Sequence, residues 1–260
     1  MTDQSFSVDS DVTLVVTSCG RFDLLKRTLE SFARFNTYPI RACILTEDSG
    51  DEAVFEALPA GWREHTQVIV NRPKLGQIRS IDTAYGLVLT PYIFHCEDDW
   101  DFYRSGFMED SKIALESSPE VLLVWLRSYY HDLRVHCPFH DRGPRKVLRG
   151  VAFYPLTSDK PGWQGFSLNP GLRRLADYQR MDSYTTSGGE EKAVAQWYAE
   201  RGFRAVILEC DAVAHTGWVQ HVVTEVDRSK RKHREHRARQ RAWLFLLVGL
   251  AAGWAIGTLN

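Results

Sequence analysis

Short apolar runs alternate with amphipathic segments over the first hundred residues. The runs are continuous and rich in β-branched residues, which is typical of buried strands. They lie at 12–17, 40–46, 66–70 and 91–96. Between them, apolar residues at helical spacing predict helices over 21–35, 52–58 and 76–89. Because such alternation is typical of βαβ units, it predicts a Rossmann-like, mostly parallel α/β sheet flanked by helices.

The pattern is weaker after residue 100. It predicts helices over 105–117, 172–180 and 190–201, and Gly202 is suited to end the last of these. Strands are predicted over 121–126, 162–168 and 204–209, and residues 212–218 lead out of the domain. Residues 128–162 are rich in Tyr, His, Arg and Pro and have little periodicity. We therefore expect a loop-rich insertion there, with one strand near 149–154.

Composition and charge narrow the class of protein. With 44% hydrophobic and 25% charged residues, the chain is an ordinary globular protein. Its net charge is −1, but residues 228–241 hold eight Lys or Arg and one Glu, so the rest of the chain is acidic. An acidic body argues against a domain that binds nucleic acid, and we expect no such partner.

The cysteines and the N-terminus indicate a compartment. The five cysteines are scattered, and none forms a C-x-x-C pair; they are Cys19, Cys43, Cys96, Cys137 and Cys210. Neither a zinc site nor a disulfide framework is suggested, and a reducing compartment fits best. Residues 1–11 are acidic and polar, unlike a secretory signal peptide. The sequence thus favours a cytosolic location for the globular domain.

The C-terminal residues predict a membrane anchor. Residues 242–259 contain no charge, and as a helix they would be about 27 Å long, enough to cross a bilayer core. Gly249, Gly253 and Gly257 recur at four-residue spacing, which suits a homodimer through a second membrane helix. The basic residues just before this segment favour the cytosolic face of a membrane. A helix buried against the domain, or lying in the membrane interface, is the alternative.

Three consecutive carboxylates follow the fourth apolar run. Glu97, Asp98 and Asp99 come directly after residues 91–96, and Trp100 follows them. Ligands of α/β sheets gather at the carboxyl ends of strands, where paired carboxylates can hold a divalent cation against a diphosphate. A solvated acidic turn is the alternative. No G-x-G-x-x-G loop follows the first strand and no Walker lysine loop is present, so an NAD-type fingerprint is absent.

Several motifs in fixed order resemble the GT-A-type glycosyltransferases, particularly family 2. The opening 12–31, the turn 47–50, the helix 76–86, the E-D-D form of the D-x-D motif at 97–99 and the segment 166–173 all resemble that family. Residues 188–191, 200–203 and 214–215 resemble its later catalytic helix and trailing histidine. The resemblance covers about residues 12–218. It implies a GT-A domain over 1–222, with a nucleotide-binding half at 1–100 and an acceptor-side half at 101–222. A basic linker at 223–241 and the hydrophobic helix at 242–260 would follow.

The resemblance also implies donor-site roles for individual residues. Asp99 would bind Mn²⁺ or Mg²⁺ directly and His215 would be a further ligand. Seven further residues would contact the nucleotide sugar, and a UDP-sugar is the expected donor. These residues are Thr17, Cys19, Arg21, Asp48, Arg79, Glu97 and Asp98. Other interpretations remain open: a hydrogen-bonded histidine for His215, a helix N-cap for Asp48, and solvated helix residues for the two arginines.

The acceptor hydroxyl needs a general base, and the family places a carboxylate at the position of Glu191. The family usually has an aspartate there, so the glutamate is a departure and the choice between Glu191 and the neighbouring Glu190 stays open. Both carboxylates could instead serve the helix dipole. With a base there, transfer would be a direct displacement that inverts the anomeric centre. Trp163 and Trp218 could stack on a sugar or the base, or pack in the core. The Q-x-x-R-W motif of processive synthases is absent, which favours single additions.

The sequence therefore predicts a metal-dependent glycosyltransferase whose acceptor is a glycan or is lipid-linked. A sugar-phosphate nucleotidyltransferase is the alternative enzyme, but its glycine-rich opening is replaced by Ser18-Cys19-Gly20-Arg21. A membrane-tethered scaffold that keeps the fold without catalysis is the non-enzymatic alternative.

Overall fold

The apolar run at Val12–Ser18 forms the buried strand β1 in the computed structural model, which describes residues 6–217. These residues belong to one compact unit. Within them, no helix is long and apolar enough to cross a membrane. The predicted basic linker 223–241, the hydrophobic helix 242–260 with its glycines, and Trp218 lie outside the described residues.

The N-terminal half confirms the predicted alternation. Its elements are β1, α1 (Phe22–Phe35), β2 (Cys43–Glu47), η1 (Glu52–Ala57), η2 (Arg63–His65), β3 (Thr66–Val70), α2 (Gln77–Tyr85) and β4 (Tyr92–Glu97). The four strands pair in parallel in the order β3-β2-β1-β4. Two predicted helices differ in detail: residues 52–57 form a 3₁₀ helix, and α2 ends at Tyr85 instead of continuing to Leu89.

The C-terminal half adds shorter elements. They are β5 (Trp100–Phe102), α3 (Phe107–Leu115), β6 (Val121–Trp125), η3 (Tyr129–Leu133), α4 (Arg134–His136), β7 (His140–Arg142), β8 (Lys146–Leu148), β9 (Val151–Ser158), β10 (Gly171–Arg174), α5 (Leu175–Gln179), η4 (Tyr184–Ser187), α6 (Glu191–Ala199), β11 (Arg204–Leu208) and β12 (Val213–His215). The large sheet continues as β4-β10-β6-β11-β9-β7, with β8 on β9, while β5 and β12 form a separate antiparallel pair.

Strand β10 corrects two predictions. Residues 162–168 were expected to return to the sheet and 172–180 to form one helix, but the chain returns at Gly171–Arg174 and the helix begins at Leu175. Strand β10 runs antiparallel to both β4 and β6, so the sheet is parallel in its first half and mixed in its second. The position needs a glycine, because a Cβ at Gly171 would lie 2.7 Å from the carbonyl oxygen of Val124.

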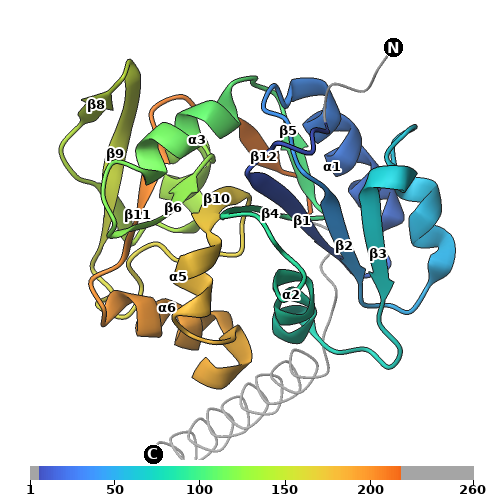
Figure 1. The fold of residues 1–260 in the computed structure, drawn as a ribbon. Coiled ribbons are helices and arrows are strands. Elements are labelled where there is room, and N and C mark those ends of the chain that lie inside the picture. Colours follow the sequence, from blue (N-terminus) through green and yellow to red (C-terminus); the bar gives the residue numbers. More distant parts are fainter. Residues whose placement is uncertain (1–5, 218–260) are drawn as a thin grey trace, which may run out of the picture. The chain divides into compact units, whose positions relative to one another are not determined.

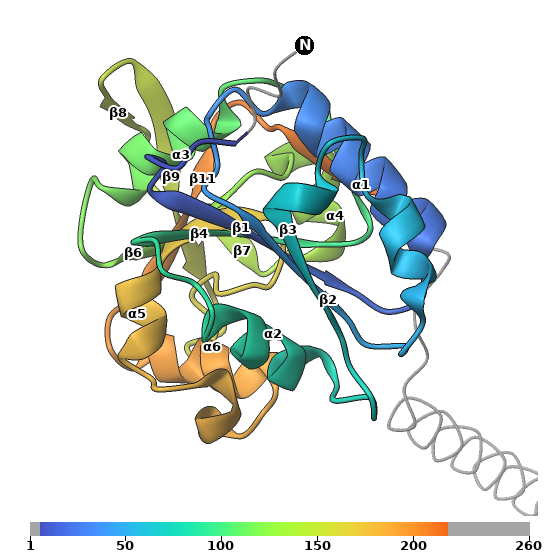
Figure 2. The same cartoon turned by 45° about the vertical axis from the view of Figure 1, so that its right-hand side comes forward.

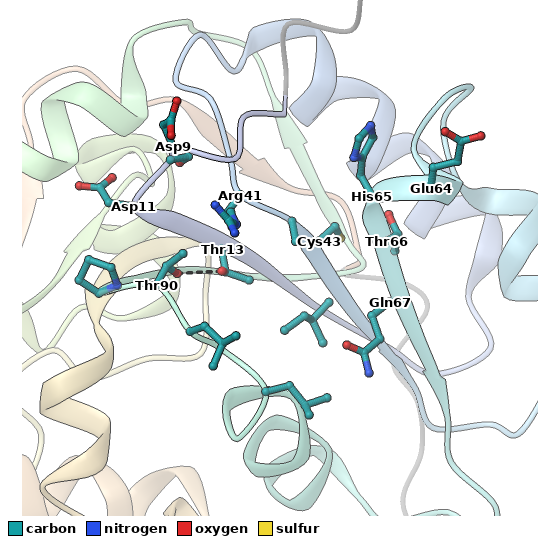
Figure 3. A pocket seen from close by; sticks show the side chains of 16 residues that line it. Asp9, Asp11, Thr13, Arg41, Cys43, Glu64, His65, Thr66, Gln67 and Thr90 are labelled. Atoms are coloured by element: carbon teal, nitrogen blue, oxygen red, sulfur yellow. Dashed lines mark hydrogen bonds between the residues drawn. The ribbon is translucent and has the colours of Figure 1, made fainter.

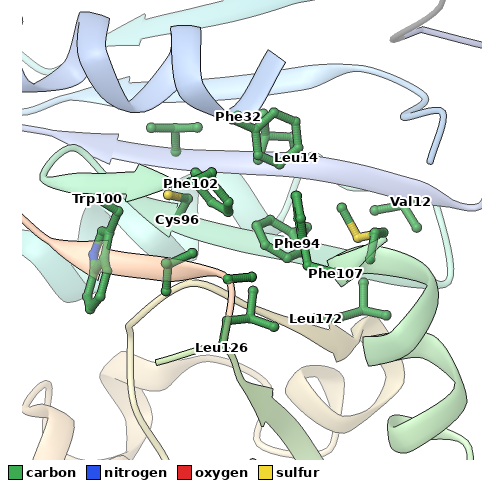
Figure 4. Close-up of a cluster of buried hydrophobic side chains, with 14 of the residues drawn as sticks. Val12, Leu14, Phe32, Phe94, Cys96, Trp100, Phe102, Phe107, Leu126 and Leu172 are labelled. Carbon is green, nitrogen blue, oxygen red and sulfur yellow. The ribbon is translucent and has the colours of Figure 1, made fainter. Parts of the chain in front are cut away.

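Helices cover both faces of the sheet. Helices α1 and α3 lie on one face and α2, α5 and α6 on the other (Figures 1 and 2). On the first face Phe32 of α1 is 1% exposed, and its ring meets those of Phe94, Phe102 and Phe107 at centroid distances of 5.3–5.8 Å (Figure 4). This aromatic cluster anchors α1 on the strands that carry the acidic triplet.

Replacing Phe32 with alanine should lower the free energy of unfolding by about 3–5 kcal/mol, the range for removing a buried Phe ring. Denaturant titration would measure the change, with Leu89→Ala as the control because Leu89 is 94% exposed. A loss in Phe32→Ala no greater than in the control would contradict this account of the core.

Candidate functional site

The carboxyl ends of three parallel strands meet at one edge of the sheet. Ser18 at the end of β1 is in register with Glu47 of β2, and Thr17 is in register with Glu97 of β4. Asp98 and Asp99 follow β4 directly. Topology therefore gathers residues from three distant parts of the sequence, as expected for an α/β sheet.

Arg21 bridges the two aspartates of the triplet. It immediately precedes α1, and its Nη1 donates to Asp99 Oδ2 at 2.8 Å. Its Nε donates to Asp98 Oδ2 at 3.3 Å, and Nη2 donates to Asp98 Oδ1. Asp98 and Asp99 are 1% and 5% exposed. Buried carboxylates require a compensating cation, and Arg21 provides a forked one.

The three carboxyl groups differ in how readily they ionise. Burial, followed by the negative charge of Asp99, raises the pKa of Glu97 to about 8. Burial also raises the pKa of Asp98 to about 6, although Arg21 offsets part of the rise. Burial opposes ionisation of Asp99 as well, but hydrogen bonding to His215 and the charge of Arg21 hold its pKa below the ordinary value. Asp99 is thus the most readily charged of the three.

The small β5–β12 sheet brings His215 to Asp99. His215 is in register with Trp100, and its Nε2 lies 3.3 Å from Asp99 Oδ2. The Thr216 N–H donates to the Asp99 carbonyl at 2.8 Å. A side chain at Gly217 would overlap the Asp99 carboxylate, so only glycine allows this close approach. Pairing of two short strands therefore positions the histidine.

This set of side chains suits a cation that the protein holds with few ligands. Among residues 6–217, no group of three or more His, Cys, Asp or Glu side chains is arranged to enclose a metal ion. Asp99 Oδ2 and His215 Nε2 nevertheless converge from two strands. Mg²⁺ and Mn²⁺ sites often use one or two carboxylates plus substrate phosphates, so the arrangement fits an ion completed by a diphosphate.

The two carboxylates at the carboxyl end of β2 have different hydrogen-bond partners. The oxygens of Asp48 accept hydrogen bonds from Leu75 N and Gly76 N, at 2.8 and 2.9 Å, and from the side chains of Asn71 and Ser80. Asp48 thus holds the loop that leads into α2. Glu47, which sequence reasoning missed, is fully buried, and its Oε1 accepts from Gly20 N at 3.0 Å and Ser49 N at 2.7 Å.

The other expected donor-side residues occupy different environments. Cys19 donates its N–H to Asp98 Oδ2 at 3.3 Å, and Thr17 is buried within β1. Arg79 is exposed on α2. Two residues that sequence reasoning missed also lie here: Gln77 Nε2 donates to Glu97 Oε1 at 2.8 Å, and Lys74 Nζ lies 3.1 Å from Cys19 Sγ. Both follow the strand β3, and Gln77 also lies in the segment 76–86 whose resemblance to the family could have marked it.

The structure separates the two candidate bases. Glu190 is exposed at the N-terminus of α6, and its side chain makes no capping hydrogen bond. The Oε1 of Glu191 accepts from Leu168 N at 3.3 Å. Burial raises the pKa of Glu191, and Leu168 and Arg173 offset part of this rise. The charge of Glu191 in turn raises the pKa of Glu97, so the two carboxylates are within electrostatic reach.

Two residues support the loop beside Glu191. Arg173 of β10 is 2% exposed and its Nη2 donates to the carbonyls of Ser167 and Asn169, at 3.2 and 3.4 Å. Sequence reasoning missed it, because an arginine in a short segment predicted as helix gives no sign of burial. Trp163 donates from Nε1 to the Phe166 carbonyl at 2.9 Å, which gives it a structural role.

A large hollow lies at the opposite edge of the sheet. Its volume is about 770 Å³, and it is lined by the amino ends of β1, β2 and β3 and by Leu87, Leu89, Thr90 and Pro91 (Figure 3). Within its lining, Asp11 is paired with Lys112, and the hydroxyls of Thr13 and Thr90 bond each other at 2.7 Å. These polar groups are therefore already satisfied by partners within the protein.

No family model matches the chain, and no curated protein matches it by sequence. Solved structures do match. The mannosyltransferase PcManGT from Pyrobaculum calidifontis, in complex with GDP-Man and Mn²⁺, superposes with a TM-score of 0.56 at 14% identity over 76% of this chain and 56% of that chain. TarS 1–349 of S. aureus gives 0.56 at 13% identity over 79% and 60%, and its complex with UDP gives 0.53 at 11% over 78% and 59%. The chain thus spans less than two thirds of the length of each of these solved chains. It has the fold of the GT-A-type glycosyltransferases.

Proposed function

We propose that the protein transfers a sugar from a nucleotide diphosphate sugar to an acceptor hydroxyl, with the aid of Mn²⁺ or Mg²⁺. One observation carries the proposal: Arg21 and His215 both contact Asp99 at the carboxyl edge of a GT-A-like sheet. Glu191 lies within electrostatic reach of the same carboxylates.

On the donor side, negative charge develops on the diphosphate as the bond to the sugar breaks. A divalent ion held by Asp99 and His215 would supply Lewis-acid charge at that oxygen. The guanidinium of Arg21, held by Asp98 through Nε and Nη2, would place a fixed positive charge beside a phosphate oxygen of the donor. Cys19 N–H and Gln77 hold Asp98 and Glu97 in place.

On the acceptor side, Glu191 is the proposed general base. Its carboxylate takes the proton of the acceptor hydroxyl, whose oxygen forms a bond to the anomeric carbon as the bond from that carbon to the diphosphate breaks. The nucleoside diphosphate leaves with the bonding electrons, and the anomeric centre is inverted. Glu190 is exposed and has no comparable support, which favours Glu191 for this role.

The identity of the donor and the location of the enzyme extend this proposal. UDP-sugars are the expected donors, and GDP-sugars are the competing class because one similar structure holds GDP-Man and another UDP. The apolar residues 242–259 and the basic residues before them support attachment to the cytosolic face of a membrane. A glycan or lipid-linked acceptor, and a homodimer through Gly249, Gly253 and Gly257, belong to the same proposal.

A thermal-shift screen tests the function directly. UDP, GDP, UDP-glucose and GDP-mannose would each be added with MnCl₂ and, as the control, with EDTA. A ligand at a hundred times its Kd stabilises the folded state by about 2.7 kcal/mol, so one nucleotide class should raise Tm clearly and only with the metal. Absence of a shift with every nucleotide, or shifts that are equal in EDTA, would contradict the metal-dependent assignment. Pyrophosphate release from a nucleoside triphosphate and a sugar phosphate would favour the nucleotidyltransferase instead.

A further inference from the structure

A smaller hollow of about 350 Å³ borders the site on the side of β12. Its polar lining includes Tyr103, His131, Asp132, His136, Asp211 and His215. Because His215 also contacts Asp99, one side chain forms part of both the hollow and the carboxylate cluster. The hollow is therefore next to the position where the leaving diphosphate would be held, and nothing in the proposed donor chemistry uses its other residues.

The carboxylates of this hollow are held in place by hydrogen bonds. Arg127 is 6% exposed and binds Asp132 with two hydrogen bonds, Nε to Oδ2 at 2.7 Å and Nη2 to Oδ1 at 2.5 Å. The Tyr103 hydroxyl donates to Asp211 Oδ2 at 2.6 Å. Tyr103 is nevertheless 43% exposed, so it remains accessible to a ligand. The hollow thus offers preoriented acceptors beside an aromatic ring.

The charge of the lining selects against anions. Two carboxylates, those of Asp132 and Asp211, border the hollow, and among the described residues that line it there is no Lys or Arg. Arg127, which lies outside the lining, forms an ion pair with Asp132. No cation of the lining therefore offsets the charge of Asp211. A phosphate or carboxylate ligand would face repulsion there. Neutral hydroxyl groups can instead donate to the carboxylates and exchange hydrogen bonds with the imidazoles.

We propose that this hollow is the acceptor subsite and binds an uncharged sugar residue, with Tyr103 packing against the sugar ring, Asp211 accepting hydrogen bonds from its hydroxyls, and His131 exchanging hydrogen bonds with them. The inference rests on the proposed function, which it deepens by naming the acceptor class. A volume of about 350 Å³ is at the lower end of the range for small-ligand sites and accommodates a monosaccharide unit. Phosphate-bearing parts of any lipid-linked acceptor would lie outside it.

The position of Glu191 agrees with this assignment. Cys137 follows directly after His136 on the rim of the hollow, and the charges of Asp132 and Glu191 both raise the pKa of its thiol, after the larger effect of burial. The rim is therefore within electrostatic reach of the proposed base.

Direct binding tests the inference independently of turnover. Neutral methyl glycosides, and the same glycosides carrying a 6-phosphate, would be titrated into the full chain with MnCl₂ and UDP and followed by saturation-transfer NMR. We expect neutral glycosides to bind and the Tyr103→Ala variant to weaken them at least tenfold. Tyr130→Ala is the matched control, because Tyr130 is 65% exposed and does not line the hollow. Binding of no neutral glycoside, equal binding by Tyr103→Ala and wild type, or a preference for the phosphorylated glycosides would overturn the proposal.

Kinetics separate failure of the inference from failure of the function. If transfer is observed, Tyr103→Ala and His131→Ala should raise the acceptor KM at least tenfold and leave the donor KM within twofold. An acceptor KM unchanged in both variants would refute the subsite while leaving the glycosyltransferase assignment intact. If no nucleotide raises Tm, the function itself fails, whereas the NMR experiment still decides whether the hollow binds sugars.

Discussion

Asp99→Asn is expected to lower the turnover of sugar transfer by about a thousandfold or more, because loss of several kcal/mol of charge stabilisation at the leaving group is worth that factor. Asparagine keeps the size of the side chain, and its amide oxygen can still accept from Arg21, so the fold should be retained. Asparagine carries no negative charge, whereas Asp99 is the one carboxyl group of the triplet whose pKa is held low. The substitution therefore removes a charge and changes little else.

The experiment compares turnover and metal affinity in wild type, Asp99→Asn and Asp101→Asn. Asp101 is the matched control because it lies two residues further along the chain and pairs with Arg27. We expect the apparent Mn²⁺ affinity to fall together with turnover in Asp99→Asn, and both to stay near the wild-type values in Asp101→Asn. Turnover within tenfold of wild type in Asp99→Asn would exclude Asp99 as the metal ligand of the reaction.

Glu191→Gln should reduce transfer by about a hundredfold to ten-thousandfold, the range for losing a general base. Glutamine can still accept from Leu168 N and fill the same space, so donor binding should be preserved. Glu190→Gln is the control, since Glu190 precedes Glu191 in the chain but is exposed. The donor KM, turnover and the Mn²⁺-dependent thermal shift would be measured for all three proteins. Equal losses in both variants would mean that charge at the start of α6, rather than a base, accounts for the effect.

The pH dependence of transfer distinguishes the base role further. A general base works when ionised, so activity should fall as the pH drops through the pKa of Glu191. Burial raises that pKa, which moves the acid limb of the kcat profile above the ordinary range for a glutamate. Residual activity of Glu191→Gln should lack this limb. A limb that persists unchanged in the variant would assign it to another group.

Local pattern was sufficient for much of the fold. The strands β1–β4 and the helix α1 have nearly the predicted bounds, since buried strands and amphipathic helices impose different spacings of apolar residues within a few positions. The placement of the acidic triplet at the end of β4 also followed from the sequence. By contrast, β10 was missed because its four residues have no independent signal; pairing with β4 and β6 makes them a strand.

The sequence alone could not predict which of two adjacent carboxylates is buried or which partners each one contacts. Glu47 and Asp48 both follow an apolar run, yet one meets the turn after β1 and the other the loop before α2. Glu190 and Glu191 differ in the same way, one exposed and one held by Leu168 N–H. Neighbouring side chains point in different directions, and the partners they meet come from distant segments.

The sequence by itself determined the α/β alternation and the presence of carboxylates at a strand end, because both depend on interactions between near neighbours in the chain. Only the tertiary structure decided that Arg21 bridges Asp98 and Asp99 and that β12 brings His215 to the same oxygen. Those contacts join residues far apart in sequence, and the free energy that selects them comes from the pairing of strands and the burial of charge, which no local pattern encodes.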